Sequence, residues 1–313
     1  HWWTKAEPIW TLAENSGVRT AVYYWDGCQV EINNVIPTRC LMYRPIRNWD
    51  AVNEETEASL EQILNGFSRN KFSLSLLYYE PIDHYGHKYG PNSNETFDAV
   101  RKIDTIISRL LESIEKRNLS DVVNVYIVSD HGMAEPKAFI WLEDYIDFND
   151  VDLYIKNGPV SMLKAVSSEA EQRIYNRLRT NASDLGLNVY RKHEIPEEMH
   201  IKHNRLTFPL LLIVKPGYYL HLPSIKGKIF PHFNQTNSDR SSFKLPKGDH
   251  GYFAKEEHRM RGITYAIGPA FKRGFNSTAL KQIDHYQIFC HILGLHPKPH
   301  NGSWERVKDM LAE

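Results

Sequence analysis

Three short segments of the chain place histidine beside aspartate and glycine. They are residues 83–87 (Asp-His-Tyr-Gly-His), 129–132 (Ser-Asp-His-Gly) and 248–251 (Gly-Asp-His-Gly). Hydrolytic zinc sites use imidazole nitrogens and carboxylate oxygens as ligands and keep one coordination position open. Two such ions held close together can clamp both the attacking and the leaving oxygen of a phosphoester. One such segment alone would indicate only a capping carboxylate and a surface histidine, but all of them in one chain predict a metal-dependent hydrolytic site.

Predicted strands precede two of these segments. Residues 122–128 are apolar and rich in β-branched side chains, which predicts a buried strand that ends just before the second segment. Residues 72–79 (Phe-Ser-Leu-Ser-Leu-Leu-Tyr-Tyr) are also strand-like and end just before the first. An amphipathic helix predicted over residues 96–116 connects the two strands. This strand–helix–strand order predicts two parallel strands in one sheet, whose carboxyl edge would bring both segments together.

Not every histidine in the segments is an expected ligand. The chain contains 15 histidines, and most of them have no comparable context. His84 lies inside the first segment, but the adjacent Gly86 and the spacing favour His87 as the ligand. The step of four residues from Asp83 to His87 is compatible with either a helical turn or a compact loop. The third segment, around His250, follows a polar, irregular stretch.

The chain as a whole resembles the ectonucleotide pyrophosphatase/phosphodiesterase family of the alkaline-phosphatase superfamily. The resemblance implies an α/β fold with a central, mostly parallel sheet flanked by helices, incomplete at the amino terminus. It implies one partial catalytic domain over residues 1–313, and residues 138–208 have the pattern of a mixed insertion within it. Residues 87–91 and 290–295 are most similar to the type-4/type-5 branch. The stretches that carry the resemblance are residues 2–3, 7–10, 30–32, 83–91, 129–133, 248–252, 268–271 and 290–295.

The resemblance also implies ligand roles. Asp83, His87 and His250 would hold one zinc ion, and Asp130 and His131 the other. In the family, the second zinc also needs an upstream aspartate and a nucleophilic threonine or serine, both expected before residue 1. A zinc ion with two protein ligands should bind weakly. We therefore expect two zinc ions in the full-length parent, one in this chain alone, and little or no turnover by this chain.

The expected substrate is small. The formal net charge of zero provides no field that would attract a nucleic acid polymer. The resemblance implies hydrolysis of nucleotide phosphodiester or pyrophosphate bonds, as in dinucleoside polyphosphates or NAD, with Tyr43 and Tyr78 stacking on the base. Two alternatives remain open: a choline-phosphodiester hydrolase of the same family, and a catalytically inactive ectodomain that keeps a metal site for binding or structure.

Several features favour the secretory pathway and an extracellular or cell-surface location. Cys28 and Cys40 flank a short polar loop at positions where the family does not typically have cysteine, so we expect a disulfide between them; the alternative is two unrelated thiols. The longest apolar run, residues 210–214, is too short to span a bilayer, so we expect no membrane segment here, although the parent could be secreted or anchored. Acceptor motifs for N-glycosylation occur at Asn94, Asn118, Asn181, Asn234, Asn276 and Asn301.

Overall fold

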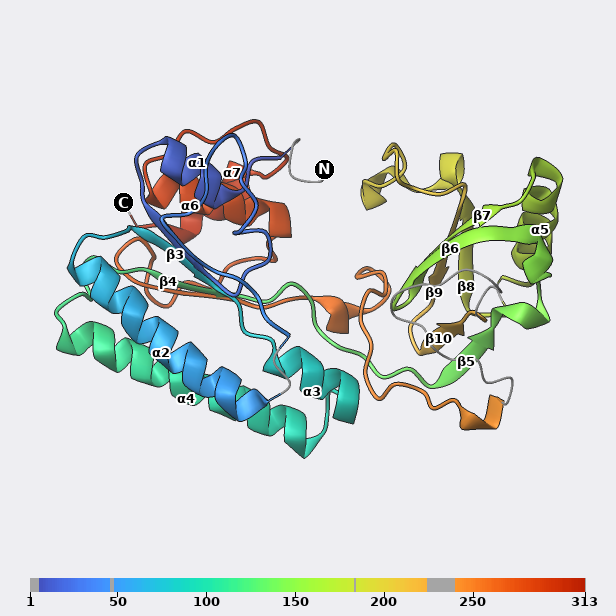
Figure 1. Ribbon diagram of the computed structural model, residues 1–313, viewed down its shortest axis with the longest axis horizontal. Helices are drawn as coiled ribbons and strands as arrows, with labels where there is room; N and C mark the ends of the chain where they lie inside the picture. Colours follow the sequence, from blue (N-terminus) through green and yellow to red (C-terminus); the bar gives the residue numbers. More distant parts are fainter. Residues whose placement is uncertain (1–5, 46–47, 183, 224–239, 313) are drawn as a thin grey trace. The chain divides into compact units, whose positions relative to one another are not determined.

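The structure is a computed structural model (Figure 1) that describes residues 6–45, 48–182, 184–223 and 240–312. The Trp2–Trp3 segment and the sequon at Asn234 lie outside these ranges. The chain divides into two compact units. Unit 1 comprises His1–Ile82, Phe97–Val128 and Ile263–Glu313, and unit 2 comprises Asp83–Thr96 and Ser129–Gly262. None of the helices described is long and apolar enough to cross a membrane.

Unit 1 is built on a parallel sheet. Its strands are β1 (Thr20–Tyr23), β2 (Arg39–Leu41) and β3 (Leu74–Leu77), in the order β2-β1-β3. The central strand β1 is buried along its whole length, as expected for a strand covered on both faces. The flanking helices are α1 (Ile9–Asn15), α2 (Trp49–Ser68), α4 (Asn94–Lys116), α6 (His285–Ile292) and α7 (Trp304–Val307).

Helices α2 and α4 run side by side (Figure 1) and are joined by polar contacts. Arg109 Nη1 of α4 lies 2.8 Å from Glu57 Oε1 of α2. About two helical turns further along, Arg117, just after α4, donates to the side-chain oxygen of Asn65 at 2.9 Å. The predicted amphipathic helix over residues 96–116 is thus present as α4, which begins two residues earlier.

The prediction that the two ligand-bearing strands belong to one sheet is wrong for the residues that the structure describes, although the ligands that follow them do lie together. Strand β3 hydrogen-bonds β1, whereas β4 (Val125–Val128) pairs with β11 (Thr264–Ile267) in a separate antiparallel ribbon. Within the described ranges, β3 and β4 therefore do not share a hydrogen-bonded sheet. Hydrophobic pattern identifies a strand but not its neighbour, because pairing depends on segments distant in sequence. The α/β architecture and the parallel sheet flanked by helices are confirmed.

Unit 2 contains a four-stranded antiparallel sheet. Its order is β6-β7-β9-β8, with strands β6 (Val151–Asn157), β7 (Val160–Ala165), β8 (Leu187–Arg191) and β9 (Leu210–Val214). Helix α5 (Ser168–Asn181) and the 3₁₀ segments between residues 192 and 199 supply apolar side chains to the clusters that bury β9 completely. Strand β5 (Ala138–Trp141) pairs in parallel with β10 (Tyr218–His221). Residues 138–208 lie wholly in this unit. Their strands β6, β7 and β8 share a sheet with β9, which follows them, whereas β5 pairs with β10.

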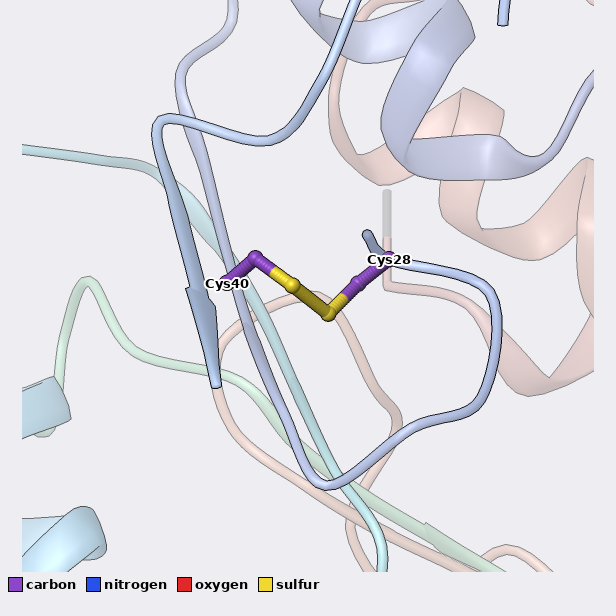
Figure 2. The surroundings of a disulfide bond; sticks show 2 residues. All are labelled: Cys28 and Cys40. Carbon is purple, nitrogen blue, oxygen red and sulfur yellow. A yellow bond between two sulfur atoms is a disulfide. The ribbon is translucent and has the colours of Figure 1, made fainter. Parts of the chain in front are cut away.

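A disulfide bond joins Cys28 and Cys40 (Figure 2), the pairing expected from the sequence. It connects the loop after β1 to strand β2, and the two Cα atoms are 5.7 Å apart, within the usual range for a disulfide. The Cys28 side chain is fully buried. The remaining cysteine, Cys290, is buried as a free thiol in α6.

Candidate metal centre

Helix α3 (Pro81–Tyr89) carries the first of the three segments. Proline at the first helical position is favourable because its fixed φ suits a helix and its missing N–H has no partner there anyway. Asp83 and His87 are one turn apart, so their side chains lie on the same face. The structure therefore selects the helical turn over the compact loop, and His87 Nε2 lies 3.5 Å from Asp83 Oδ1.

Three imidazoles converge on Asp83. The Nε2 atoms of His87 and His250 each lie 3.5 Å from Asp83 Oδ1, and that of His131 lies 3.9 Å away. These separations exceed those of good hydrogen bonds, and Asp83 Oδ1 is buried without a hydrogen-bond partner. A buried carboxylate oxygen facing imidazole nitrogens at this spacing fits a cation placed among them. Ligand atoms of Asp83, His87 and His250 all lie within 4.8 Å of one another, a group that could hold a metal ion.

Backbone carbonyls fix the tautomers of two of these histidines. His87 Nδ1 lies 2.9 Å from the Gly248 carbonyl oxygen, and His131 Nδ1 lies 2.9 Å from that of Gly132. A carbonyl only accepts, so each Nδ1 carries the proton and donates it. Each Nε2 is left with a lone pair, as in metal-binding histidines whose second nitrogen is hydrogen-bonded to the protein.

His250 is also held in the neutral form that binds metals. Burial, followed by the neighbouring His131, lowers the pKa of His250 from 6.5 to about 4. The rings of His131 and His250 are stacked, with centroids 3.5 Å apart and planes 10° apart. Because ligands must be deprotonated before a metal binds, this environment leaves His250 available over the physiological pH range.

Asp130 lies at the edge of this cluster. Its Oδ1 accepts from the backbone N–H of His131 at 3.1 Å, and its Oδ2 lies 3.4 Å from His131 Nε2. The Asp130 side chain is 74% exposed, against 35% for Asp83. The structure thus brings the expected ligands of both metal ions into one unit, with Asp83, His87 and His250 closely grouped and Asp130 and His131 beside them.

Glycines allow the three segments to interlock. A Cβ atom at Gly248 would overlap the carbonyl oxygen of Gly86 in α3, and one at Gly132 would overlap the carbonyl oxygen of Arg259. The second and third segments are also tied by paired backbone hydrogen bonds between Ala134 and Asp249, at 2.9 and 2.8 Å. Segments that are far apart in sequence are therefore positioned by backbone contacts that larger residues would prevent.

Two charged residues next to the site, Asp249 and Lys156, were not predicted from the sequence. Asp249 is only 5% exposed, and burial raises its pKa. Burial also lowers the pKa of Lys156, on β6, to about 8, while Asp249 opposes that shift. The Lys156 ammonium lies 3.8 Å from the centre of the Tyr219 ring. The position of Asp249 beside His250 was visible in the motif, but nothing in the local sequence marks Lys156.

The expected base-stacking residues, Tyr43 and Tyr78, belong to unit 1. With Tyr24, Trp49, Glu55 and Glu80 they line a surface pocket. Their rings are 6.0 Å apart at an interplanar angle of 71°, so the two do not stack on each other. The Tyr43 hydroxyl donates to Glu80 at 2.6 Å.

The sequon asparagines differ in exposure. Asn94, Asn118, Asn276 and Asn301 are exposed. Asn181 is half-buried, and its side-chain amide donates to the carbonyl oxygen of Arg177 at 2.8 Å.

Comparison of the sequence with known proteins shows which family the chain belongs to. Residues 1–253 match the family described as type I phosphodiesterase / nucleotide pyrophosphatase. A bis(5'-adenosyl)-triphosphatase of Xenopus laevis is 31% identical over 316 positions, which cover 99% of this chain and 63% of the relative. Human ectonucleotide pyrophosphatase/phosphodiesterase family member 5 is 31% identical over 312 positions, covering 99% of this chain and 59% of the relative.

Comparison with solved structures leads to the same family. The structure of human family member 5 superposes with a TM-score of 0.84 at 27% identity, covering 99% of this chain and 76% of that one. An inactive variant of the murine protein in complex with AMP gives a TM-score of 0.81 at 28% identity, with the same coverage. This chain spans about three-fifths of the length of the curated relatives. It belongs to the ectonucleotide pyrophosphatase/phosphodiesterase family, in the type-4/type-5 branch.

Proposed function

We propose that the protein serves zinc-dependent hydrolysis of nucleotide phosphodiester or pyrophosphate bonds. The observation that carries this proposal is the buried Asp83 Oδ1, which has no hydrogen-bond partner and faces the Nε2 atoms of His87, His131 and His250. Imidazole and carboxylate ligands in this number suit zinc better than magnesium or calcium, which prefer oxygen ligands.

Asp83, His87 and His250 would hold one zinc ion, and Asp130 and His131 would contribute to a second. Bound zinc supplies Lewis-acid stabilisation of phosphoryl oxygens and lowers the pKa of an attacking hydroxyl or water. The protein residues prepare the site for it. The carbonyl oxygens of Gly248 and Gly132 accept hydrogen bonds from the Nδ1–H groups of His87 and His131, which orients both Nε2 lone pairs toward Asp83.

The two sites should differ in affinity. Three protein ligands and an open position match a catalytic zinc site, whereas Asp130 and His131 alone provide fewer ligands than such a site needs. We infer that these 313 residues bind one zinc ion firmly at Asp83, His87 and His250. Covalent phosphoryl transfer also needs a hydroxyl nucleophile, which none of the five expected ligands supplies.

A nucleotide is the substrate that the pocket of unit 1 and the relatives best support. A relative is named a bis(5'-adenosyl)-triphosphatase, and a solved neighbour holds AMP. Tyr43 and Tyr78 are 38% and 36% exposed, so their rings are accessible to a base. Stacking of a base on an aromatic side chain contributes about 1–3 kcal/mol in single-stranded nucleic acid complexes.

A choline phosphodiester is the second candidate. Glu55 and Glu80 line the same pocket as Tyr43 and Tyr78, and aromatic rings with nearby carboxylates favour a quaternary ammonium group. Equilibrium dialysis with AMP and with phosphocholine distinguishes the two. Selective retention of AMP supports the nucleotide proposal, and selective retention of phosphocholine would replace it.

Zinc content tests the metal assignment. The protein, stripped with chelator and dialysed against limiting zinc, should retain about one ion per chain, and Asp83→Asn should retain much less because one charged ligand is lost. Asp104→Asn, an exposed aspartate on α4, is the matched control and should behave like the unmodified chain. Equal zinc retention by all three would refute the assignment of Asp83.

We further propose an extracellular or cell-surface location with N-glycosylation. The disulfide between Cys28 and Cys40 and the exposed sequons at Asn94, Asn118 and Asn276 support it. Protein made through the secretory pathway should lose mass on enzymatic deglycosylation. Asn181 should be the site with the lowest occupancy among those described, because its amide is engaged with Arg177; peptide mapping that shows no glycan at any site would contradict the proposal.

A further inference from the structure

The turn between β6 and β7 packs against the metal-binding segment that carries His250. Asn157 pairs with Val160, so Gly158 and Pro159 form a two-residue turn. A Cβ atom placed on Gly158 would lie 2.6 Å from the carbonyl oxygen of His250. Real Cβ atoms essentially never approach this closely, so only glycine allows the turn to lie here.

The contact continues along the segment. The same Cβ would lie 3.1 Å from Asp249 Oδ1, the atom that accepts the backbone N–H of His250 at 2.9 Å. On the other side of the turn, a Cβ on Gly251 would lie 3.3 Å from Pro159 Cδ. The turn thus meets three consecutive residues centred on His250, and it comes from the part of the chain whose pattern predicted an insertion.

The same hairpin supplies a positive charge. Lys156 is two residues before Gly158 on the same hairpin, whose turn lies against Asp249 Oδ1, and the charge of each residue shifts the pKa of the other. Asp249 Oδ2 is buried and has no hydrogen-bond partner. An isolated buried carboxylate is costly, and a nearby cation offsets that cost. Lys156 therefore favours the buried position of Asp249. Asp249 in turn accepts a hydrogen bond from the backbone N–H of His250.

We propose that the β6–β7 hairpin is a positioning element of the metal centre, in which Gly158 and Lys156 act through Asp249 to hold His250 in place. This inference rests on the proposed metal-binding function of His250. It assigns the hairpin a role in metal affinity that is separate from its contribution to the sheet of unit 2. Partners behind a metal ligand typically change affinity by about 10- to 100-fold when altered.

Gly158→Ala tests the steric part, and Gly217→Ala is its matched control. Both glycines lie in turns of unit 2 and have positive φ, +53° and +89°, so alanine strains the backbone at both. A Cβ on Gly217 meets nothing within 4 Å, whereas one on Gly158 meets His250. The readout is cobalt(II) bound in place of zinc, measured by its visible absorption during titration against a competing chelator.

The expected result is a cobalt affinity about 10- to 100-fold lower for Gly158→Ala, with altered absorption bands, and no change for Gly217→Ala. A merely structural role would lower thermal stability in both variants without changing the bands. Folded Gly158→Ala that binds cobalt like the unmodified protein overturns the steric part. Failure of the unmodified protein to bind cobalt would instead refute the proposed function.

Lys156 provides a second test that does not depend on the folding of Gly158→Ala. Lys156→Met removes the charge and should weaken cobalt binding, whereas Lys156→Arg keeps the charge and should restore most of it. Equal cobalt affinity in Lys156→Met and the unmodified protein overturns the electrostatic part. If Gly158→Ala does not fold, the two Lys156 variants decide the proposal.

Discussion

Replacing Asp284 by asparagine should strongly destabilise unit 1. The Asp284 side chain is completely buried. Its two oxygens accept from Arg306 Nε and Nη2, each at 2.7 Å, from the backbone N–H of Ser303 at 2.8 Å and from that of Lys281 at 2.9 Å. This carboxylate links the start of α6 to α7, and asparagine can accept on one of its two polar atoms only.

The pKa of Asp284 sets the scale of the effect. Burial raises this pKa, but hydrogen bonds from Arg306 and from the N–H groups of Ser303 and Lys281 outweigh burial and lower it from 3.8 to about 2. This lowering corresponds to about 2 kcal/mol of stability. Because the folded pKa lies below the unfolded one, this stability is present above about pH 4 and is lost as the pH falls through about 2.

Urea unfolding measures this directly. At pH 7 we expect Asp284→Asn to lose ~2–4 kcal/mol of unfolding free energy, since Arg306 and the N–H donors lose a charged acceptor. The loss should shrink in acid, where the unmodified carboxylate also becomes protonated. Asp309→Asn, an exposed aspartate nearby, is the control and should change stability by less than about 0.5 kcal/mol. Equal stability of Asp284→Asn and the unmodified protein at pH 7 would refute this reasoning.

Three other outcomes are expected. Replacing both Cys28 and Cys40 by serine should cost ~3 kcal/mol of unfolding free energy, from the entropy of the 12-residue separation that the disulfide closes; a loss below ~1 kcal/mol in urea unfolding would contradict this. His87→Ala should abolish zinc retention in dialysis, whereas His84→Ala, in the same helix, should not; the reverse order would exchange their assigned roles. Zinc at 100 times its dissociation constant should raise the unfolding free energy by ~2.7 kcal/mol, and a melting temperature insensitive to zinc would argue against a site formed only in the folded chain.

The sequence identified the candidate ligands because their chemistry is local. The pairs Asp83 with His87 and Asp130 with His131 lie within one turn or are adjacent, and the glycines beside them indicate close backbone approach. The structure explains those glycines, since a Cβ atom on Gly86 would lie 2.9 Å from the Met133 side chain and one on Gly132 would overlap the carbonyl oxygen of Arg259. Whether the bound metal is zinc, and how many ions bind, stay predictions.

The features that the sequence could not predict depend on distant segments. Residues 72–79 and 122–128 were recognised as strands, but their neighbours, β1 and β11, could not be identified from pattern alone. Lys156 has no local feature that distinguishes it from any lysine in an exposed strand. Its proposed role in the metal centre depends on the β6–β7 hairpin, which brings it near Asp249, 93 positions further along the chain.

Anomalous diffraction at the zinc absorption edge, from crystals of the protein grown with zinc, locates any bound zinc ion directly. We expect a peak among Asp83, His87 and His250, at ~2.0–2.2 Å from their ligand atoms. A weaker peak or none is expected beside Asp130 and His131. Strong zinc peaks elsewhere, with none at the Asp83 group, would contradict the metal centre proposed for this chain.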